Sequence, residues 1–347
     1  MNNKTITFLS SRGRGMNADL SLLHGFLSDG DEWSEYSCRF FLKSERTKNA
    51  VVNAGIQKAR KTFSESAVNT ICIDNSLTGK SEEDEGVRIL YSVPYDYQFK
   101  NYFAAKKKSC NFRTFQSFTH IVPGSPFSEE LLRRAYDTEG KKIVAGTAHP
   151  LAWDVCQKAS REKARKKLEF YFPAIEGKKI LSIIMNGERK EQEKFFKDFS
   201  FDSFMEKLGP DWLVLSTSEE MRDCSFTYTG DKEAFGYIDH IVPASVLVYV
   251  ADVLVTNEGR FAAAYAGRGK PVYCPRIKKN YFEKFMDVEY PELVLKKADQ
   301  MTEIDFEREG LTEMQRRFCS QFWYADAEEP YSALQIIREN ETLQKEG

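Results

Sequence analysis

Residues 251–271, ADVLVTNEGRFAAAYAGRGKP, give the clearest indication of the fold. Their first six residues form a short, valine-rich apolar run, typical of a parallel β-strand that is covered on both faces. A polar turn follows at 257–260, and the alanine-rich segment 261–267 predicts a closely packed helix. The turn would lie at the carboxyl end of the strand, where open α/β sheets bind their ligands. The alternative is an ordinary strand–helix repeat of an α/β domain, which has the same pattern and binds no ligand.

Length and composition narrow the class of protein. A chain of 347 residues favours two domains over one. The formal net charge is only -2, so no overall field attracts nucleic acid, and we expect no nucleic-acid partner. The seven cysteines are scattered without a CxxC motif, which predicts reduced thiols and neither a disulfide framework nor a zinc site.

The sequence also bears on membrane association. The amino terminus lacks the apolar run of a signal peptide, and no stretch approaches 18 apolar residues, so we expect a cytoplasmic protein. Residues 99–108, FKNYFAAKKK, interleave aromatic residues with lysines. Such a segment either rests on anionic lipid headgroups at the inner face of the membrane or forms an amphipathic surface helix.

Strand-like and helix-like segments alternate along the chain. The predicted strands are 5–9, 38–42, 69–73, 87–93, 119–123, 141–146, 179–185, 212–216, 237–241, 251–256 and 272–275. The predicted helices are 18–27, 48–63, 128–136, 160–171, 192–208, a segment opened by Pro243, 261–267, 311–323 and 330–341. This alternation predicts an α/β protein with two doubly wound, Rossmann-like domains that face a central cleft. The expected divisions are 1–172, 173–310 and two closing helices in 311–347.

Polar residues follow three predicted strands of the second half. Parallel strands end at one edge of a sheet, so we expect these residues to bind a diphosphate and its ribose. The candidates are Asn186, Gly187, Arg189, His240, Asn257, Glu258, Gly259 and Arg260. For the two arginines the alternative is a surface ion pair. Ligand contact is favoured for Arg260, which follows a glycine at a strand end.

Two histidines of the first half are candidates for catalysis. His24 lies within the predicted helix 18–27, where a partly buried structural histidine is the alternative. His149 lies near Asp154 at the expected junction, where an imidazole could bind phosphate or move a proton. The chain has neither an HExxH motif nor a GxxxxGK[ST] loop, so metalloprotease and P-loop ATPase activities are poorly supported, and we expect no bound metal or cofactor.

Residues 88–276 resemble the CDP-glycerol glycerophosphotransferase family, which builds and primes wall teichoic acids on a two-domain GT-B scaffold. The resemblance rests on the segment IVAGTAHPLAWD at 143–154, the basic helix at 160–168, the strand start GKKIL at 177–181 and the strand at 251–256. Residues 185–189 keep only the final arginine of the family's Ala-Pro-Thr-Trp-Arg segment. The turn at 257–260 replaces Asp-Tyr-Ser-Ser and is similar to the nucleotide-sugar loop of GT-B glycosyltransferases.

The resemblance implies a metal-independent transferase that moves glycerol phosphate, or a related polyol phosphate, from a CDP-activated donor to a cell-surface polymer or glycan. Lipid-linked acceptors are among those expected. The family's catalytic base lies in a His-Gly-Thr-Pro segment, and the matching residues 94–97 contain no histidine. Asp96, His24 or His149 would then act as the base. Two alternatives remain open: a GT-B glycosyltransferase that uses a UDP- or CMP-sugar, and a non-catalytic GT-B-like binding module.

Overall fold

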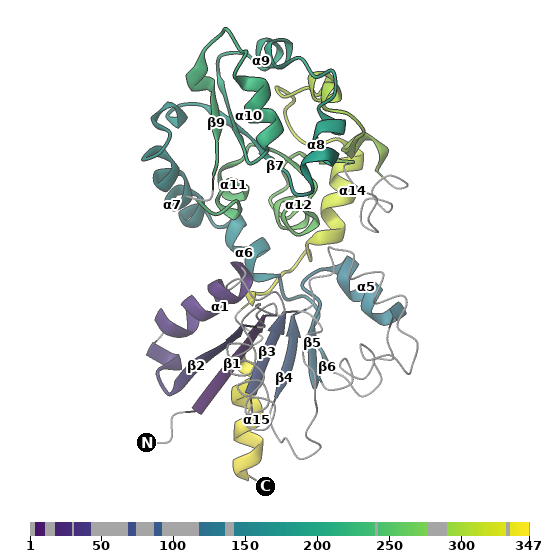
Figure 1. The fold of residues 1–347 in the computed structure, drawn as a ribbon. Coiled ribbons are helices and arrows are strands. Elements are labelled where there is room, and N and C mark those ends of the chain that lie inside the picture. Colours follow the sequence, from purple (N-terminus) through teal and green to yellow (C-terminus); the bar gives the residue numbers. More distant parts are fainter. Residues whose placement is uncertain are drawn as a thin grey trace, which may run out of the picture. The chain divides into compact units, whose positions relative to one another are not determined.

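The computed structural model describes residues 4–10, 18–29, 31–42, 69–73, 87–91, 118–135, 142–239, 242–276, 290–330 and 334–346. The chain forms two compact units (Figure 1). The first unit comprises residues 1–94, 100–151 and 323–347, and the second comprises 95–99 and 152–322. The sequence predicted a domain boundary between residues 172 and 173, and it grouped the last two helices in one closing segment, 311–347. In the structure the basic helix belongs to the second unit, and the two closing helices belong to different units.

A six-stranded sheet forms the centre of the first unit, and all of its strand pairs are parallel. The strands are β1 (Lys4–Ser10), β2 (Tyr36–Leu42), β3 (Asn69–Ile73), β4 (Arg88–Tyr91), β5 (His120–Val122) and β6 (Lys142–Ile143). Their order is β2-β1-β3-β4-β5-β6. This order is doubly wound, as the alternation of apolar segments predicted.

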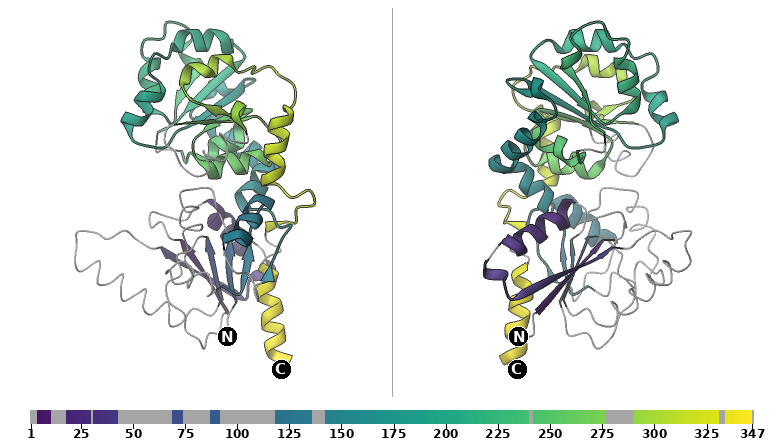
Figure 2. Two further views of the ribbon diagram at one scale, coloured as in Figure 1. Left: turned by 90° about the vertical axis from the view of Figure 1, so that its right-hand side faces the viewer. Right: turned by 60° about the vertical axis from the view of Figure 1, so that its left-hand side comes forward.

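Helices from both ends of the chain cover this sheet (Figure 2). They are α1 (Ala18–Asp29), the short 3-10 helix η1 (Asp31–Trp33), α5 (Pro126–Ala135) and α15 (Gln335–Glu346). Ile6 and Phe8 of β1 share one buried cluster with Trp33 and with Ile337 of α15. The guanidinium of Arg338 lies 3.8 Å from the centre of the Trp33 ring. The carboxyl-terminal helix is therefore part of the core of the first unit.

The second unit has its own six-stranded parallel sheet. Its strands are β7 (Lys179–Ile184), β8 (Trp212–Ser216), β9 (Phe235–Tyr237), β10 (Val253–Thr256), β11 (Val272–Pro275) and β12 (Val294–Leu295). Their order is β12-β11-β10-β7-β8-β9. Numbered along the chain and read from β9, this is 3-2-1-4-5-6, so the direction of winding reverses between β7 and β10.

Helices lie on both faces of the second sheet (Figure 1). They are α7 (Lys158–Glu169), α8 (Arg189–Phe195), α9 (Phe201–Leu208), α10 (Glu219–Ser225), α11 (Ser245–Val250), α12 (Gly259–Ala266) and α14 (Glu313–Phe322). The helix α6 (Pro150–Cys156), which precedes α7, begins in the first unit. An aromatic cluster that includes Phe201, Phe204 and Trp212 fills one side. The alanines of α12 are buried as expected, and the Tyr265 hydroxyl donates to the carbonyl of Ala251 at 3.1 Å.

The structure corrects some of the expected elements. The single helix expected at 192–208 is two helices, because Asp198 adopts a left-handed conformation (φ 65°) and Ser200 caps α9 by accepting a hydrogen bond from the Ser203 amide. β9 ends at Tyr237, earlier than predicted. The sequence pattern missed α6, α10 and β12. The helix expected at 48–63 and the lysine-rich segment 99–108 lie outside the described residues. In the part of the chain that is described, no helix combines the length and apolarity needed to span a bilayer.

Candidate functional site

Two of the predicted loops meet where the winding of the second sheet reverses. The Asn186 amide, just after β7, donates to Asn257 Oδ1 at 2.8 Å, and Asn257 Nδ2 donates back to the Asn186 carbonyl at 2.5 Å. The Asn186 side chain also donates to Glu258 Oε2 at 2.6 Å. Doubly wound sheets bind ligands at this position because the loops diverge there and leave a crevice. The structure therefore brings together Asn186, Asn257 and Glu258 as the sequence predicted.

A pocket of about 510 Å³ opens beside these loops, at the carboxyl ends of β7, β8 and β9. Its volume lies within the range of small-molecule sites. It is lined by Met185, Asn186, Gly187, Arg189, Gln192, Thr217, Glu219, Glu220, Tyr237, Ile238, Asp239, Val242, Pro243 and Ala244. His240 lies outside the described residues, and its neighbour Asp239 lines the pocket. All of these residues belong to the second unit.

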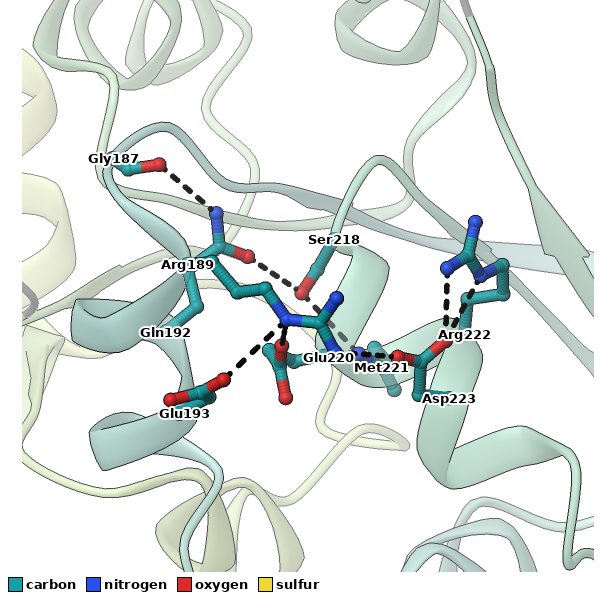
Figure 3. Close-up of polar contacts among 9 residues, drawn as sticks. All are labelled: Gly187, Arg189, Gln192, Glu193, Ser218, Glu220, Met221, Arg222 and Asp223. Carbon is teal, nitrogen blue, oxygen red and sulfur yellow. Dashed lines mark hydrogen bonds and ion pairs between the residues drawn. The ribbon is translucent and has the colours of Figure 1, made fainter.

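Arg189 is surrounded by carboxylates (Figure 3). Its Nε lies 3.0 Å from Glu220 Oε1 and 3.4 Å from Glu193 Oε1, and its Nη2 lies 3.1 Å from Asp223 Oδ2. The negative field, first of Glu220 and then of Asp223, raises the pKa of the Arg189 guanidinium above its usual value. The structure thus shows Arg189 in the ion pairs that were the alternative to a phosphate contact.

The charged lining of the pocket is mainly acidic. Among the described residues that line it, Glu219, Glu220 and Asp239 lie in the wall with the single cation Arg189. Burial raises the pKa of Glu220 in spite of the opposing effect of Arg189. This wall offers many hydrogen-bond acceptors and little positive potential. It suits hydroxyl and amino groups better than phosphate.

An aromatic ring forms another part of the wall. Tyr237 lines the pocket, and the Arg222 guanidinium lies 5.0 Å from the centre of its ring. Asp223 Oδ1 accepts from Arg222 Nη2 at 2.9 Å and from Arg222 Nε at 3.1 Å, so the guanidinium is fixed in place (Figure 3). The other oxygen of Asp223 binds Arg189. One carboxylate therefore binds both Arg189 and the arginine that lies over the Tyr237 ring.

Hydrogen bonds also join the loops after β7 and β8. The Met185 amide donates to Thr217 Oγ1 at 3.0 Å, and the Ser218 hydroxyl donates to Gln192 Oε1 at 2.9 Å. Gln192 in turn donates to the Gly187 carbonyl at 3.5 Å (Figure 3). Gly187 has φ 130°, a region that favours glycine. The rim of the pocket is therefore held by contacts between loops distant in sequence.

The first turn of α12 is the part of the site best suited to an anion. The helix begins at buried Gly259, and the side chain of the N-cap residue Glu258 makes no capping hydrogen bond. That side chain accepts instead from Asn186. The amide groups at the start of a helix attract negative charge, and Arg260 adds a cation there, with its guanidinium 5.1 Å from the Phe261 ring.

Two of the catalytic candidates, His24 and His149, lie in the first unit. His24 is half-buried on α1, with its ring at 6.4 Å and nearly perpendicular to the ring of Phe8. His149 is only 2% exposed and meets Tyr91 edge-on at 6.4 Å. A Cβ at Gly124 would lie 3.0 Å from His149 Cδ2, so the backbone packs directly on the imidazole. This environment favours a packing role for His149. Asp96 lies outside the described residues.

Asp154 has a structural role in the second unit. Its carboxylate accepts hydrogen bonds from Ser160 Oγ and from the Tyr249 hydroxyl, each at 2.6 Å. These bonds tie α6 to α7 and α11. Asp154, which the sequence placed near His149 at the junction, therefore links three helices.

Sequence reasoning missed much of the pocket wall. The missed residues include the polar or charged Thr217, Glu219, Glu220, Tyr237 and Asp239. Tyr237 ends β9 and Asp239 follows it, whereas Thr217, Glu219 and Glu220 follow β8. The rule that found the other two loops would have found most of them had it been applied to β8 and to the actual end of β9. No cluster of three metal-binding side chains occurs among the residues whose placement is described.

Comparison with known proteins identifies the fold. No protein-family model matches the chain, and no curated protein has significant sequence similarity to it. The solved structure of the wall teichoic acid polymerase TagF aligns over 99% of this chain and 90% of its own, with a TM-score of 0.64 and 11% identity. The chain has a GT-B fold.

Two further solved structures share this fold. The UDP-GlcNAc 2-epimerase of Methanocaldococcus jannaschii aligns over 97% of this chain and 99% of its own, with a TM-score of 0.59 and 9% identity. A putative UDP-N-acetylglucosamine 2-epimerase from Listeria monocytogenes aligns over 99% and 97%, with a TM-score of 0.57 and 11% identity. At such identities the likeness concerns the fold, and the activity has to be argued from the site.

Proposed function

We propose that this protein is a metal-independent GT-B transferase that uses a nucleotide-diphosphate donor, with CDP-glycerol as the donor we favour. The main support is the joining of Asn186 to Asn257 and Glu258 at the strand reversal, beside a pocket and the first turn of a helix. This is the position where doubly wound sheets bind nucleotides. Two further observations support the choice of donor: the chain shares its fold with the wall teichoic acid polymerase TagF, and residues 88–276 resemble the glycerophosphotransferase family.

The distribution of charge suggests how the donor lies. The acidic pocket would take the nucleoside, with the base on Tyr237 and the ribose hydroxyls donating to carboxylates. The diphosphate would lie at the first turn of α12, beside Arg260. Cytosine presents an amino group where uracil presents a carbonyl oxygen. A wall rich in acceptors therefore favours cytidine over uridine.

In the proposed reaction, an acceptor hydroxyl attacks the β-phosphorus of CDP-glycerol. The bond from that phosphorus to the bridging oxygen breaks, CMP leaves, and glycerol phosphate becomes esterified to the acceptor. Negative charge grows on the leaving phosphate, where Arg260 and the amides of α12 would stabilise it. Asp96 is the base we propose for the hydroxyl proton, because His149 is buried.

A second candidate is a glycosyltransferase with a nucleotide-sugar donor. Glu258 favours it, because a carboxylate fixed at the strand end by Asn186 can accept hydrogen bonds from sugar hydroxyls. In that reaction the acceptor attacks the anomeric carbon, and the nucleoside diphosphate leaves. Both candidates share the site and differ in the bond that breaks.

We also propose a polyol-phosphate or glycan acceptor, lipid-linked, at the cytoplasmic face of the membrane. This part rests on the family resemblance. The segment 99–108, which suggested membrane contact, lies outside the described residues.

The test is a donor panel with the purified full chain. CDP-glycerol, a CMP-sugar and UDP-sugars are each incubated with and without a polyol-phosphate acceptor, and nucleotide release is measured in the presence and absence of EDTA. We expect acceptor-dependent release of CMP from CDP-glycerol that EDTA does not change. Release of a nucleoside diphosphate from a sugar donor would establish the second candidate. Binding without turnover of any donor would indicate a non-catalytic module.

A further inference from the structure

One helix of the second unit carries an outward face of unusual composition. α7 lies beside α11 at the outside of this unit (Figure 1). Lys163, Lys166, Lys167 and Phe170 are spaced i, i+3, i+4 and i+7, so they share one face of the helix and its end. All four are exposed. We call them, together with Tyr171, the α7 face.

The opposite side of α7 is fixed to the unit. Leu168 is fully buried, and Arg161 Nη1 donates to the Cys156 carbonyl at 2.7 Å. Arg165 Nη2 donates to the carbonyls of Ile175 and Lys178, at 2.5 and 3.1 Å. Two of the basic residues of α7 therefore hold the helix in place. The lysines of the α7 face have no such role.

The aromatic residues are presented on a rigid support. Phe170 is 82% exposed and Tyr171 is 43% exposed, and their rings meet edge-on at 5.1 Å. The next residue, Phe172, points inward, and its ring packs so closely on Gly236 that a Cβ there would lie 2.7 Å from it. The Phe172 amide also donates to the Leu168 carbonyl at 2.8 Å. The two exposed rings therefore project from an anchored turn.

The charge of the α7 face is not balanced locally. Within the described part of the chain, Lys163, Lys166 and Lys167 form no ion pair. The carboxylates of the helix lie on its flanks, where Glu162 is 3.7 Å from Lys158 and Glu169 is 3.7 Å from Arg165. The face therefore combines three uncompensated positive charges with two projecting aromatic rings.

We propose that the α7 face docks the second unit onto a membrane surface that contains anionic lipid. Lysines are attracted to anionic headgroups, and aromatic side chains favour the interface between headgroups and hydrocarbon. A soluble polyanion would satisfy the lysines and leave the rings in water, so the pairing of the two residue types favours lipid. This role goes beyond the proposed transfer reaction and does not depend on the identity of the donor.

Vesicle sedimentation of the full chain tests the proposal. We expect binding to vesicles of phosphatidylcholine with about one-third phosphatidylglycerol, weak binding to phosphatidylcholine alone, and loss of binding at high salt. The triple variant K163Q/K166Q/K167Q should bind about 100-fold more weakly, since each lysine near an anionic surface contributes roughly five-fold. The double variant F170S/Y171S should bind at least about 10-fold more weakly.

Matched controls lie on α8 and just after it in the same unit. The variant K190Q/K194Q/K197Q removes the same charge from exposed lysines and should bind within about two-fold of the unchanged chain. A second readout is tryptophan fluorescence. The emission spectrum of F170W minus that of the unchanged chain isolates the introduced tryptophan, and its maximum should shift to shorter wavelength only with anionic vesicles.

Three results would overturn the proposal. They are no binding to anionic vesicles, equal losses in the α7 and α8 lysine variants, and binding that F170S/Y171S leaves intact. Tight binding to soluble polyphosphate that depends on the lysines and ignores Phe170 would assign the face to a polyanion instead.

Discussion

Asn257 binds the backbone of Asn186 through both polar atoms of its side-chain amide, accepting from the amide at 2.8 Å and donating to the carbonyl at 2.5 Å. The Asn257 side chain thus makes the two backbone hydrogen bonds that a neighbouring strand would make. It does so just beyond the paired ends of β7 and β10, where the loops after these strands leave the sheet. The loops after β7 and β10 are held together there before any ligand binds. Fixing two loops in advance lowers the conformational cost of binding.

The first prediction concerns this link. Asn257→Ala removes both hydrogen bonds, which should lower the free energy of unfolding by about 1–2 kcal/mol and the midpoint of thermal unfolding by a few degrees. Donor affinity should fall as well, because the loops lose their fixed arrangement. Asn257→Asp keeps the acceptor and loses the donor, so its stability should be intermediate. Unfolding and binding curves that match those of the unchanged chain would show that the link has no function.

The second prediction separates the two arginines. Three carboxylates surround Arg189, whereas Arg260 stands in the first turn of α12. Arg260→Ala should weaken donor binding by about 2 kcal/mol, roughly 30-fold, through loss of a charged phosphate contact. Arg189→Ala should weaken it less, since its charge is already compensated. The opposite order, measured by calorimetric titration of the donor, would place the diphosphate in the pocket instead.

The third prediction tests the aromatic wall. Tyr237→Ala removes the ring proposed to stack on the base and should weaken nucleotide binding by about 1–3 kcal/mol. Tyr237→Phe keeps the ring and should bind nearly as well as the unchanged chain. Equal losses in the two variants would instead assign the effect to the hydroxyl group. Titration with CMP, which lacks the second phosphate, confines this measurement to the nucleoside end.

The fourth prediction concerns the support of the α7 turn. A Cβ at Gly236 would lie 2.7 Å from the Phe172 ring and 2.8 Å from Leu215, so Gly236→Ala should destabilise the chain by about 1–3 kcal/mol. Gly25→Ala is the matched control, because nothing lies within 4 Å of a Cβ there and alanine favours the helix. Adding Phe172→Leu to the Gly236 variant should restore part of the loss. Equal denaturation midpoints for the two glycine variants would contradict the packing argument.

The fifth prediction concerns pH. Hydrogen bonds from Lys179 at 2.5 Å and from Trp212 at 2.8 Å lower the pKa of Glu307 below its ordinary value of 4.5. A lowered pKa stabilises the fold above the ordinary value, and this contribution is lost as pH falls through the lowered one. The unchanged chain should therefore unfold at a higher temperature than Glu307→Gln near pH 7, and the difference should shrink near pH 3. A difference between the two chains that stays the same at pH 7 and pH 3 would contradict this account.

The fold followed from the sequence because both sheets are parallel and buried. Their strands read as short apolar runs separated by helices, and the alanines of 262–264 correctly indicated the close packing of α12. The break between α8 and α9 did not follow, because it depends on a left-handed Asp198, a conformation that is uncommon for residues other than glycine.

The candidate site was predicted in part. The meeting of the loops after β7 and β10 followed from their position at strand ends. The ion pairs of Arg189 did not, because Glu220 and Asp223 come from α10, a helix that the pattern missed. The pocket is acidic because Glu219 and Glu220 come from the same helix and Asp239 follows β9, which ends earlier than predicted. Local patterns thus indicated which strand-end loops meet, and contacts distant in sequence decide the charge around them.

Calorimetric titration of the full chain with CDP and with UDP tests the central claim most directly. We expect CDP to bind with a dissociation constant below about 1 mM, more tightly than UDP, and both Asn257→Ala and Arg260→Ala to weaken that binding. Absence of binding by either nucleotide at millimolar concentration, or binding that neither substitution affects, would contradict a nucleotide-diphosphate site at the strand ends of the second unit.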